Sequence, residues 1–139
     1  MTDLIKELNK KFIKNTTNLN VKSGDTVKVY QKIKEGSKER IQIFQGLVIK
    51  TTQPNSHMSR ILVRRIASGI GVEKSFLIHS PLVEKIEITK RSKVRRNYLT
   101  YMRQRTGKAA RLASLDFDKV KVNKVIEEII EKPDQDIKE

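Results

Sequence analysis

The chain has 139 residues, no cysteine, a formal net charge of +14 and a sequence pI of about 10.1. Charged residues make up 33% and hydrophobic residues 37% of the chain, against about 25% and about 45–50% in typical soluble domains, so we expect one domain with a small core rather than a layered enzyme fold. The absence of cysteine excludes disulfides, thiolate metal sites and a cysteine nucleophile. No apolar stretch approaches the ~20 residues that span a bilayer, and the charged N-terminus is unlike a secretory signal, so we expect a soluble, cytoplasmic protein.

The first predicted element is a short helix over residues 3–13. One apolar stripe at helical spacing runs along it: Leu4, Ile5, Leu8 and Phe12. Because a helix of about three turns is marginal in isolation, we expect the stripe to dock on another surface. A polar linker follows at residues 15–20, and residues 1–20 are predicted to form an N-terminal unit of helix and linker.

Residues 21–89 change to the period-two pattern of β-strands. Val27, Val29 and Ile33 alternate with polar residues, and similar runs follow after turn-like segments. The five predicted strands cover residues 26–33, 40–50, 60–66, 72–78 and 83–89. Gly46, inside the second strand, is expected to mark a bulge, a sharp bend or a close approach of two backbones. Short strands separated by turns predict a mainly β fold, a small curled sheet or barrel that carries the N-terminal helix.

Two segments of opposite charge follow the predicted barrel. Residues 90–112 form a basic extension, within which residues 97–105 are compatible with one or two helical turns that end near Gly107. Residues 113–139 form an acidic tail with a short amphipathic helix, whose apolar stripe is Val122, Val125, Ile126, Ile129 and Ile130. We expect the tail to lie away from phosphate. Its stripe either docks on a protein surface or belongs to an unstructured extension.

No constellation of residues predicts catalysis, and we expect no enzyme activity, no cofactor and no metal site. Gly107-Lys108 lacks the earlier glycine and the following Ser or Thr of a phosphate-binding loop. His57 and His79 stand in turn-like segments without the spaced partners that zinc requires. Asp116 and Asp118 lie at the start of the acidic tail, where solvated charge is the expected role.

The most informative feature is the run of residues 90–111. It holds nine Lys or Arg residues, no Asp or Glu and two tyrosines, and it contributes +9 to the net charge. A run without carboxylates cannot neutralise itself, so in isolation we expect it to stay extended or mobile and to need phosphates as partners. A solvated basic face is the alternative, but the concentration of charge and the high pI favour binding to nucleic acid.

The two tyrosines of the run allow two roles. Tyr98 and Tyr101 lie three residues apart, so a helix would place them on one face. They either stack on unpaired RNA bases or cover the end of the barrel as core residues, and the pattern favours neither. Cations outside the run extend the basic surface if they face the same way: Lys38, Arg40, Arg60, Arg64 and Arg65.

Four segments closely resemble the bacterial large-subunit ribosomal protein nineteen family, in order and at compatible spacing: FQGLVI (44–49), VRRIASGIGVEKSF (63–76), HSPLVEKIEI (79–88) and YLTYMRQRTGKAAR (98–111). The resemblance extends from about residue 3 to about residue 112. It implies an SH3-like barrel with an N-terminal helix and a basic C-terminal extension. It also implies binding to large-subunit ribosomal RNA near the subunit interface, a share in bridges to small-subunit RNA, and ribosomal proteins three and fourteen as neighbours. Typical members end soon after residue 112, so the resemblance does not explain the acidic tail.

Carried over by position, the resemblance implies RNA contacts by the cations of the run: Lys90, Arg91, Lys93, Arg95, Arg96, Arg103, Arg105, Lys108 and Arg111. The candidate interface is completed by Tyr98, Tyr101, Arg64, Arg65, Lys38 and Arg40. The predicted function is thus that of a structural ribosomal protein. The main alternative is a dissociable RNA-binding factor for maturation or transcription elongation on the same barrel, whereas an RNA-modifying enzyme is disfavoured because catalytic residues are missing.

Overall fold

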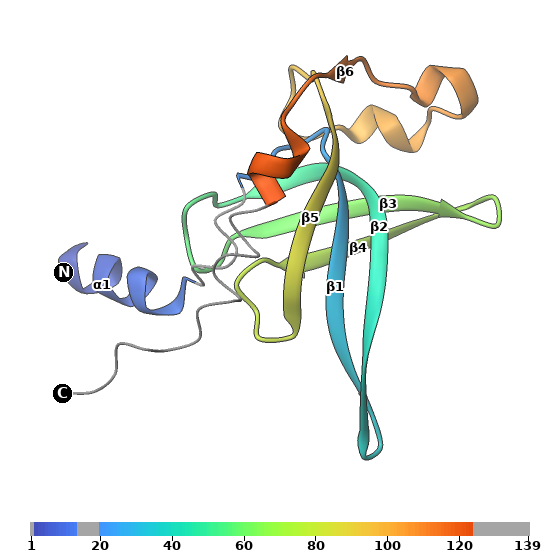
Figure 1. The fold of residues 1–139 in the computed structure, drawn as a ribbon. Helices are drawn as coiled ribbons and strands as arrows, with labels where there is room; N and C mark the ends of the chain where they lie inside the picture. The colour runs from blue at the N-terminus through green and yellow to red at the C-terminus, as the bar shows by residue number, and fades with distance from the viewer. Residues whose placement is uncertain (1, 14–19, 124–139) are drawn as a thin grey trace.

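The computed structural model describes residues 2–13 and 20–123 (Figure 1). The helix α1 spans Thr2–Phe12, and the strands are β1 (Thr26–Glu35), β2 (Lys38–Thr52), β3 (Arg60–Ala67), β4 (Ile70–Leu77), β5 (Val83–Ser92) and β6 (Ser114–Leu115). Two short 3-10 turns, η2 (Thr100–Arg103) and η3 (Gly107–Ala110), lie between β5 and β6. All five predicted strands are present, and the two-residue strand β6 is additional.

The six strands form one antiparallel sheet in the order β4-β3-β2-β1-β5-β6. The sheet curls so that β4 and β5 contribute to one core, although no hydrogen-bonded pairing joins β4 to β5 within the described residues. The prediction of a mainly β, barrel-like domain with an N-terminal helix is therefore confirmed, in the form of an open half-barrel. The β1–β2 and β3–β4 hairpins project beyond its body in different directions (Figure 1).

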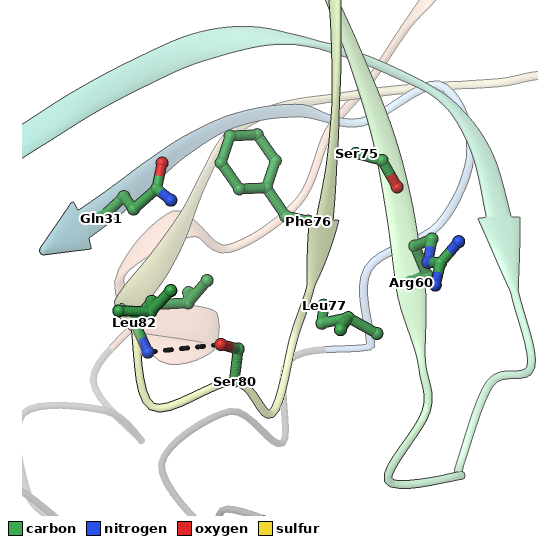
Figure 2. A pocket seen from close by; sticks show the side chains of 8 residues that line it. Gln31, Arg60, Ser75, Phe76, Leu77, Ser80 and Leu82 are labelled. Atoms are coloured by element: carbon green, nitrogen blue, oxygen red, sulfur yellow. Dashed lines mark hydrogen bonds between the residues drawn. The ribbon is translucent and has the colours of Figure 1, made fainter. Parts of the chain in front are cut away.

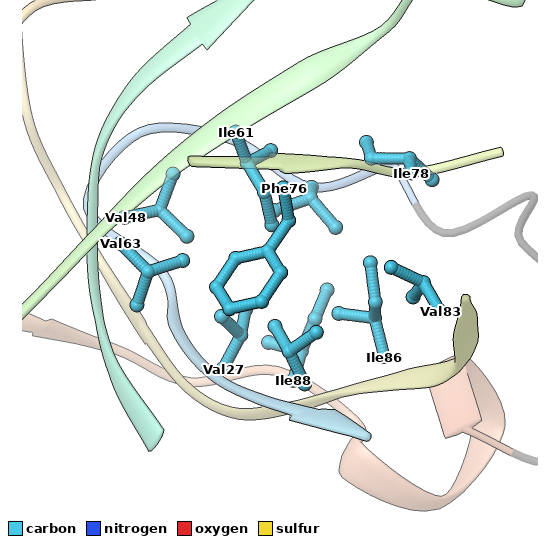
Figure 3. Packing of buried hydrophobic residues seen from close by; sticks show 11 residues of the cluster. Val27, Val48, Ile61, Val63, Phe76, Ile78, Val83, Ile86 and Ile88 are labelled. Carbon is cyan, nitrogen blue, oxygen red and sulfur yellow. The ribbon is translucent and has the colours of Figure 1, made fainter. Parts of the chain in front are cut away.

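The inner face of the curled sheet carries the main core. Side chains of a strand alternate between its two faces, and the inward positions on three strands are fully buried: Val27 and Val29, Ile61 and Val63, Ile86 and Ile88. Phe76 of β4 places its ring in the middle of this cluster (Figure 3). The period-two pattern in the sequence thus corresponds to burial in the core.

Gly46 marks a close approach between β2 and β3. A Cβ atom at this position would lie 2.5 Å from the backbone oxygen of Arg64, a distance that side-chain carbons cannot adopt. The bulge in β2 lies three residues later, where the register with β3 shifts after Val48. Val48 and Ile49 are both buried because neighbouring strand residues point to opposite faces and each face is covered: Val48 lies in the main core and Ile49 in a second cluster on the other face.

The helix α1 lies beside the loop that joins β2 to β3. The ring centroids of Phe12 and His57 are 6.1 Å apart, and His57 Nδ1 donates a hydrogen bond to Asn9 Oδ1. The apolar stripe itself stays at least half exposed, from 52% for Leu8 to 65% for Leu4. The expected docking of this stripe therefore does not occur within the described residues.

The chain after the basic run folds back onto the outer edge of β5. The strand β6 pairs with the end of β5, with Leu115 opposite Arg91. Further along, the side-chain amide of Asn123 engages both backbone groups of Ile88: Asn123 Nδ2 donates to Ile88 O at 3.2 Å, and Ile88 N donates to Asn123 Oδ1 at 3.3 Å. This edge of β5 is therefore covered at two places.

Apolar residues of the same segment also contact the core. Phe117 and Val122 are half-buried and pack against the main cluster. The described start of the predicted acidic tail thus docks on the barrel of its own chain. The rest of the predicted apolar stripe, from Val125 to Ile130, lies outside the described residues.

Candidate nucleic-acid interface

The basic segment that follows β5 is folded onto the outer face of the sheet. We call residues 93–112 the arm. Leu99 (0% exposed) and Met102 (7% exposed) are buried in the second cluster with Ile49 of β2, and Leu99 N donates to Ile49 O at 2.8 Å. The expectation that the run stays extended or mobile in isolation is therefore wrong for this part of it, because apolar residues between the cations attach it to the sheet.

The predicted helical turn is shorter than expected. Leu99 has the non-helical backbone angles φ −89° and ψ 64°, and only the four residues of η2 follow in 3-10 geometry. Tyr101 lies within η2, whereas Tyr98 pairs as an isolated β-bridge with Lys50. The second turn, η3, begins at Gly107, where the sequence suggested an end.

Both tyrosines are half-buried against the second cluster. Cations of the chain lie over their rings: Lys50 Nζ is 4.8 Å and Arg103 Cζ 5.3 Å from the centroid of Tyr98. Arg105 Cζ is 4.5 Å from the centroid of Tyr101. The packing role, one of the two that the sequence allowed, is thus present in the structure, and stacking on RNA bases stays a prediction.

Asn97 fastens the beginning of the arm to two other segments. Its Nδ2 donates to Thr51 O at 3.0 Å, and its Oδ1 accepts from Thr51 Oγ1 at 2.8 Å. Ser23 Oγ donates to the backbone oxygen of Asn97 and lies 3.2 Å from its Oδ1. The arm therefore leaves β5 in one fixed direction.

Glu73 of β4 is the carboxylate that holds the middle of the arm. Its carboxylate accepts hydrogen bonds from Arg103 Nε at 2.7 Å, from Arg103 Nη2 at 3.0 Å and from Arg64 Nη1 at 2.9 Å. Arg64 reaches it because Arg64 and Glu73 lie directly opposite each other in the β3–β4 register. The hydrogen bond from Arg103 is the main cause that lowers the pKa of Glu73, against the opposing effect of burial.

This pKa shift predicts a pH dependence. A carboxyl group with a lowered folded-state pKa contributes stability above its unfolded-state pKa, near 4.5, and loses it as the pH falls through the folded-state value. We expect the difference in unfolding free energy between the wild type and Glu73→Gln to shrink as the pH falls below 4.5. Urea unfolding at a series of pH values measures it. Parallel loss of stability in the two proteins would refute the prediction.

Asp25 forms the second charge pair, at the point where β5 ends. Its side chain is 1% exposed. The carboxylate accepts a hydrogen bond from Arg91 Nε at 3.2 Å and another from the backbone N–H of Lys22 at 3.0 Å. Burial raises the pKa of Asp25, although Arg91 and the Lys22 N–H act in the opposite direction. Its contribution to the pH dependence therefore has the opposite sign to that of Glu73, and it cancels in the comparison above because both proteins retain Asp25.

Eleven of the predicted cations fall into two groups. Four of them have carboxylate partners in the chain: Arg91 with Asp25, Arg103 and Arg64 with Glu73, and Arg40 with Glu35. Seven cations of the run are exposed and have no carboxylate partner within residues 2–13 and 20–123: Lys90, Lys93, Arg95, Arg96, Arg105, Lys108 and Arg111. These seven are the charges available for phosphate.

The structure does not bring Lys38, Arg40 or Arg65 to the arm. Lys38 and Arg40 lie at the tip of the β1–β2 hairpin, whereas the arm starts at the Thr26 end of β1. Nine residues of strand, about 30 Å, separate these two ends. Arg65 points to the face opposite to Arg64, where its Cζ lies 5.4 Å from the ring centroid of Phe44.

Four residues of this region were not predicted from the sequence. Lys22 and Lys50 are cations that the fold places beside the arm, and no signal in the sequence marks them. Asp25 and Glu73 are the carboxylates that orient the arginines. A sequence signal did exist for Glu73, since it is the lone acid within the basic segment of residues 60–76.

A separate hollow of about 300 Å³ lies between β4 and the β4–β5 turn. Figure 2 shows it lined by the apolar side chains of Phe76, Leu77 and Leu82 and by Arg60 at one side. Leu82 N donates to Ser80 Oγ at 3.3 Å and shapes the turn. The arm contributes no residue to this hollow, so it is not part of the basic surface.

Within the described part of the chain there is neither a membrane-spanning helix nor a cluster of metal ligands. None of its helices combines the length and apolar character needed to cross a membrane. The described residues also contain no group of three or more His, Cys, Asp or Glu that could hold a metal ion.

The chain is similar to known proteins over most of its length. The model of the family described as ribosomal protein L19 matches residues 3–115. The large ribosomal subunit protein bL19 of Mesomycoplasma hyopneumoniae (strain 232) is 55% identical over 92 residues, which are 66% of this chain and 75% of that protein. The protein of that name from Clostridium perfringens (strain 13 / Type A) is 45% identical over 116 residues, 83% of this chain and 98% of that protein. These matches cover the small β half-barrel and the basic arm docked on it. The chain therefore belongs to the ribosomal protein L19 family.

Proposed function

We propose that the chain is a structural protein of the large ribosomal subunit and that it binds ribosomal RNA through its arm. Membership of the family makes it a non-enzymatic constituent of the ribosome in the cytoplasm. The observation that supports the arm as the binding element is its set of six exposed cations without carboxylate partners in the described chain, to which Lys90 at the end of β5 adds a seventh. Each phosphate that such a cation neutralises releases counterions, which favours association with RNA.

We further propose that the protein lies near the subunit interface and shares in bridges to small-subunit RNA, with ribosomal proteins three and fourteen as neighbours. The sequence resemblance supports this location, and the name of the relatives supports the large ribosomal subunit as the particle that contains the chain. The proposed division of the chain is residues 1–20 as helix and linker, 21–89 as barrel, 90–112 as RNA-binding extension and 113–139 as acidic tail.

Washing ribosomes with salt tests the structural role. A protein held by charge alone, through six to ten phosphate contacts, loses roughly 10³–10⁵ in affinity between about 50 and 200 mM salt. A protein that is also interlocked with folded RNA stays bound, and we expect retention of this chain on the large subunit after such a wash. Release at moderate salt would contradict the structural role and favour the dissociable factor.

A further inference from the structure

A groove of about 650 Å³ lies where the arm leaves the barrel. Residues 20–25 form one wall and residues 91–97 the other, and Thr51 and Leu115 also line it. Four exposed cations that form no ion pair in the described chain stand along these walls: Lys22, Lys93, Arg95 and Arg96. The groove is thus a concave site with positive charge on both sides.

The two walls are tied together by the fold itself. Arg91, from the arm side, donates to the buried carboxylate of Asp25 and to Asn20 O, at 3.2 Å through its Nη2, on the other side. The Ser23–Asn97 contact joins the walls a second time. Because groups of the chain itself make these links, binding does not need to order the walls first, and the entropy lost on association is smaller.

The lining is not uniformly charged. Val21, Val94 and Leu115 contribute apolar surface, and Val21 and Val94 are largely covered whereas Leu115 is 44% exposed. The charge of Asp25 inside the groove is matched by Arg91. A ligand that fits must therefore combine negative charge at the rim with a flat or apolar part inside.

We propose that this groove holds one unpaired nucleotide of ribosomal RNA, with its base between the walls and the flanking phosphates on Lys22, Lys93, Arg95 and Arg96. The proposal rests on the proposed function, since it specifies which RNA feature the arm surface binds. A paired helix is convex and keeps its bases inside, so it can contact the rim but cannot enter the groove. Unpaired bases in bulges and loops can be extruded, which is how proteins usually recognise irregular RNA.

Binding of the full chain to two short RNA hairpins tests this proposal. One hairpin is fully paired, and the other is identical except for a single bulged nucleotide, so that the number of phosphates is nearly the same. We expect the bulged hairpin to bind at least about fivefold more tightly, the lower end of what one bound base contributes. We expect Leu115→Ala to lose most of this preference and to leave the salt dependence unchanged, because it removes apolar surface but no charge.

Leu77→Ala on β4 is the matched control, since Leu77 is 40% exposed and lies outside the groove. It is expected to keep the wild-type preference. Lys22→Ala should weaken binding to the bulged hairpin more than Lys32→Ala, which removes the same charge from a distant part of β1. Equal affinity of the wild type for both hairpins would overturn the groove proposal and leave RNA binding by the arm intact. Failure to bind either hairpin at about 0.1 M salt would instead contradict the proposed function.

Discussion

Replacing Leu99 with alanine is expected to lower the free energy of unfolding by about 2–5 kcal/mol, the range for leucine truncation in a packed core. Leu99 is fully buried although it stands in the most basic part of the chain. It fills the second cluster between Ile49 and Met102 and links the arm to β2 through its backbone N–H. The variant loses apolar contacts and leaves a cavity that the sheet, fixed by its strand pairing, cannot close.

Urea unfolding followed by circular dichroism measures the loss, and amide exchange at Met102 reports on detachment of the arm. Leu82→Ala is the control, because Leu82 is 53% exposed and its truncation should change stability by less than about 1 kcal/mol. If the arm detaches before the barrel unfolds, exchange at Met102 rises while the main transition hardly moves. Equal effects of the two substitutions on both measurements would show that the arm is not anchored through Leu99.

Removal of three arm charges is expected to have the largest effect on RNA binding. Arg95, Arg96 and Arg105 are exposed and lack carboxylate partners in the described chain. If each neutralises one phosphate, the triple alanine variant should lose about 50- to 150-fold in affinity at about 0.15 M salt. The slope of log affinity against log salt should decrease by about 2–3. Binding to a large-subunit RNA fragment across a salt series measures both quantities.

The matched control removes three charges elsewhere. Lys6, Lys10 and Lys11 are exposed on α1, and their replacement by alanine should reduce the slope by less than the arm variant does. Arg96 and Arg105 lie over the Tyr101 ring, so circular dichroism should first establish that the arm variant is folded. The same slope in the wild type and in the folded arm variant would mean that these arginines do not contact phosphate.

The strands were predictable from sequence because their burial is periodic. Val27 and Val29 on β1 and Ile86 and Ile88 on β5 point to one face, and alternation along a strand makes this face visible in the sequence. The close approach at Gly46 was among the expected explanations of an interior glycine. These features depend on local pattern alone.

The arrangement of the arm depends on contacts between distant parts of the chain, which local pattern does not contain. Leu99 and Met102 each follow a tyrosine in a short stretch between cations, and this stretch is too short for a periodicity to show which side chains are buried. The pairing of Arg103 with Glu73 exists only once the arm lies on the outer face of the sheet. The charge pattern therefore indicated the basic segment. It did not distinguish the cations without an ion pair from Arg91 and Arg103, which pair with Asp25 and Glu73.

The contact between Asn123 and Ile88 covers backbone groups at the outer edge of β5. The outer side of β5 would otherwise present unpaired backbone groups, and such an edge is a template on which a second copy can add a strand. Asn123 occupies the donor and the acceptor of Ile88 with one side chain, and β6 occupies the groups near Arg91. Asn123 lies beyond residue 115, where the family match ends. The chain beyond the family match thus reduces the number of unpaired backbone groups at the outer edge of β5 with which a strand of a second copy could pair.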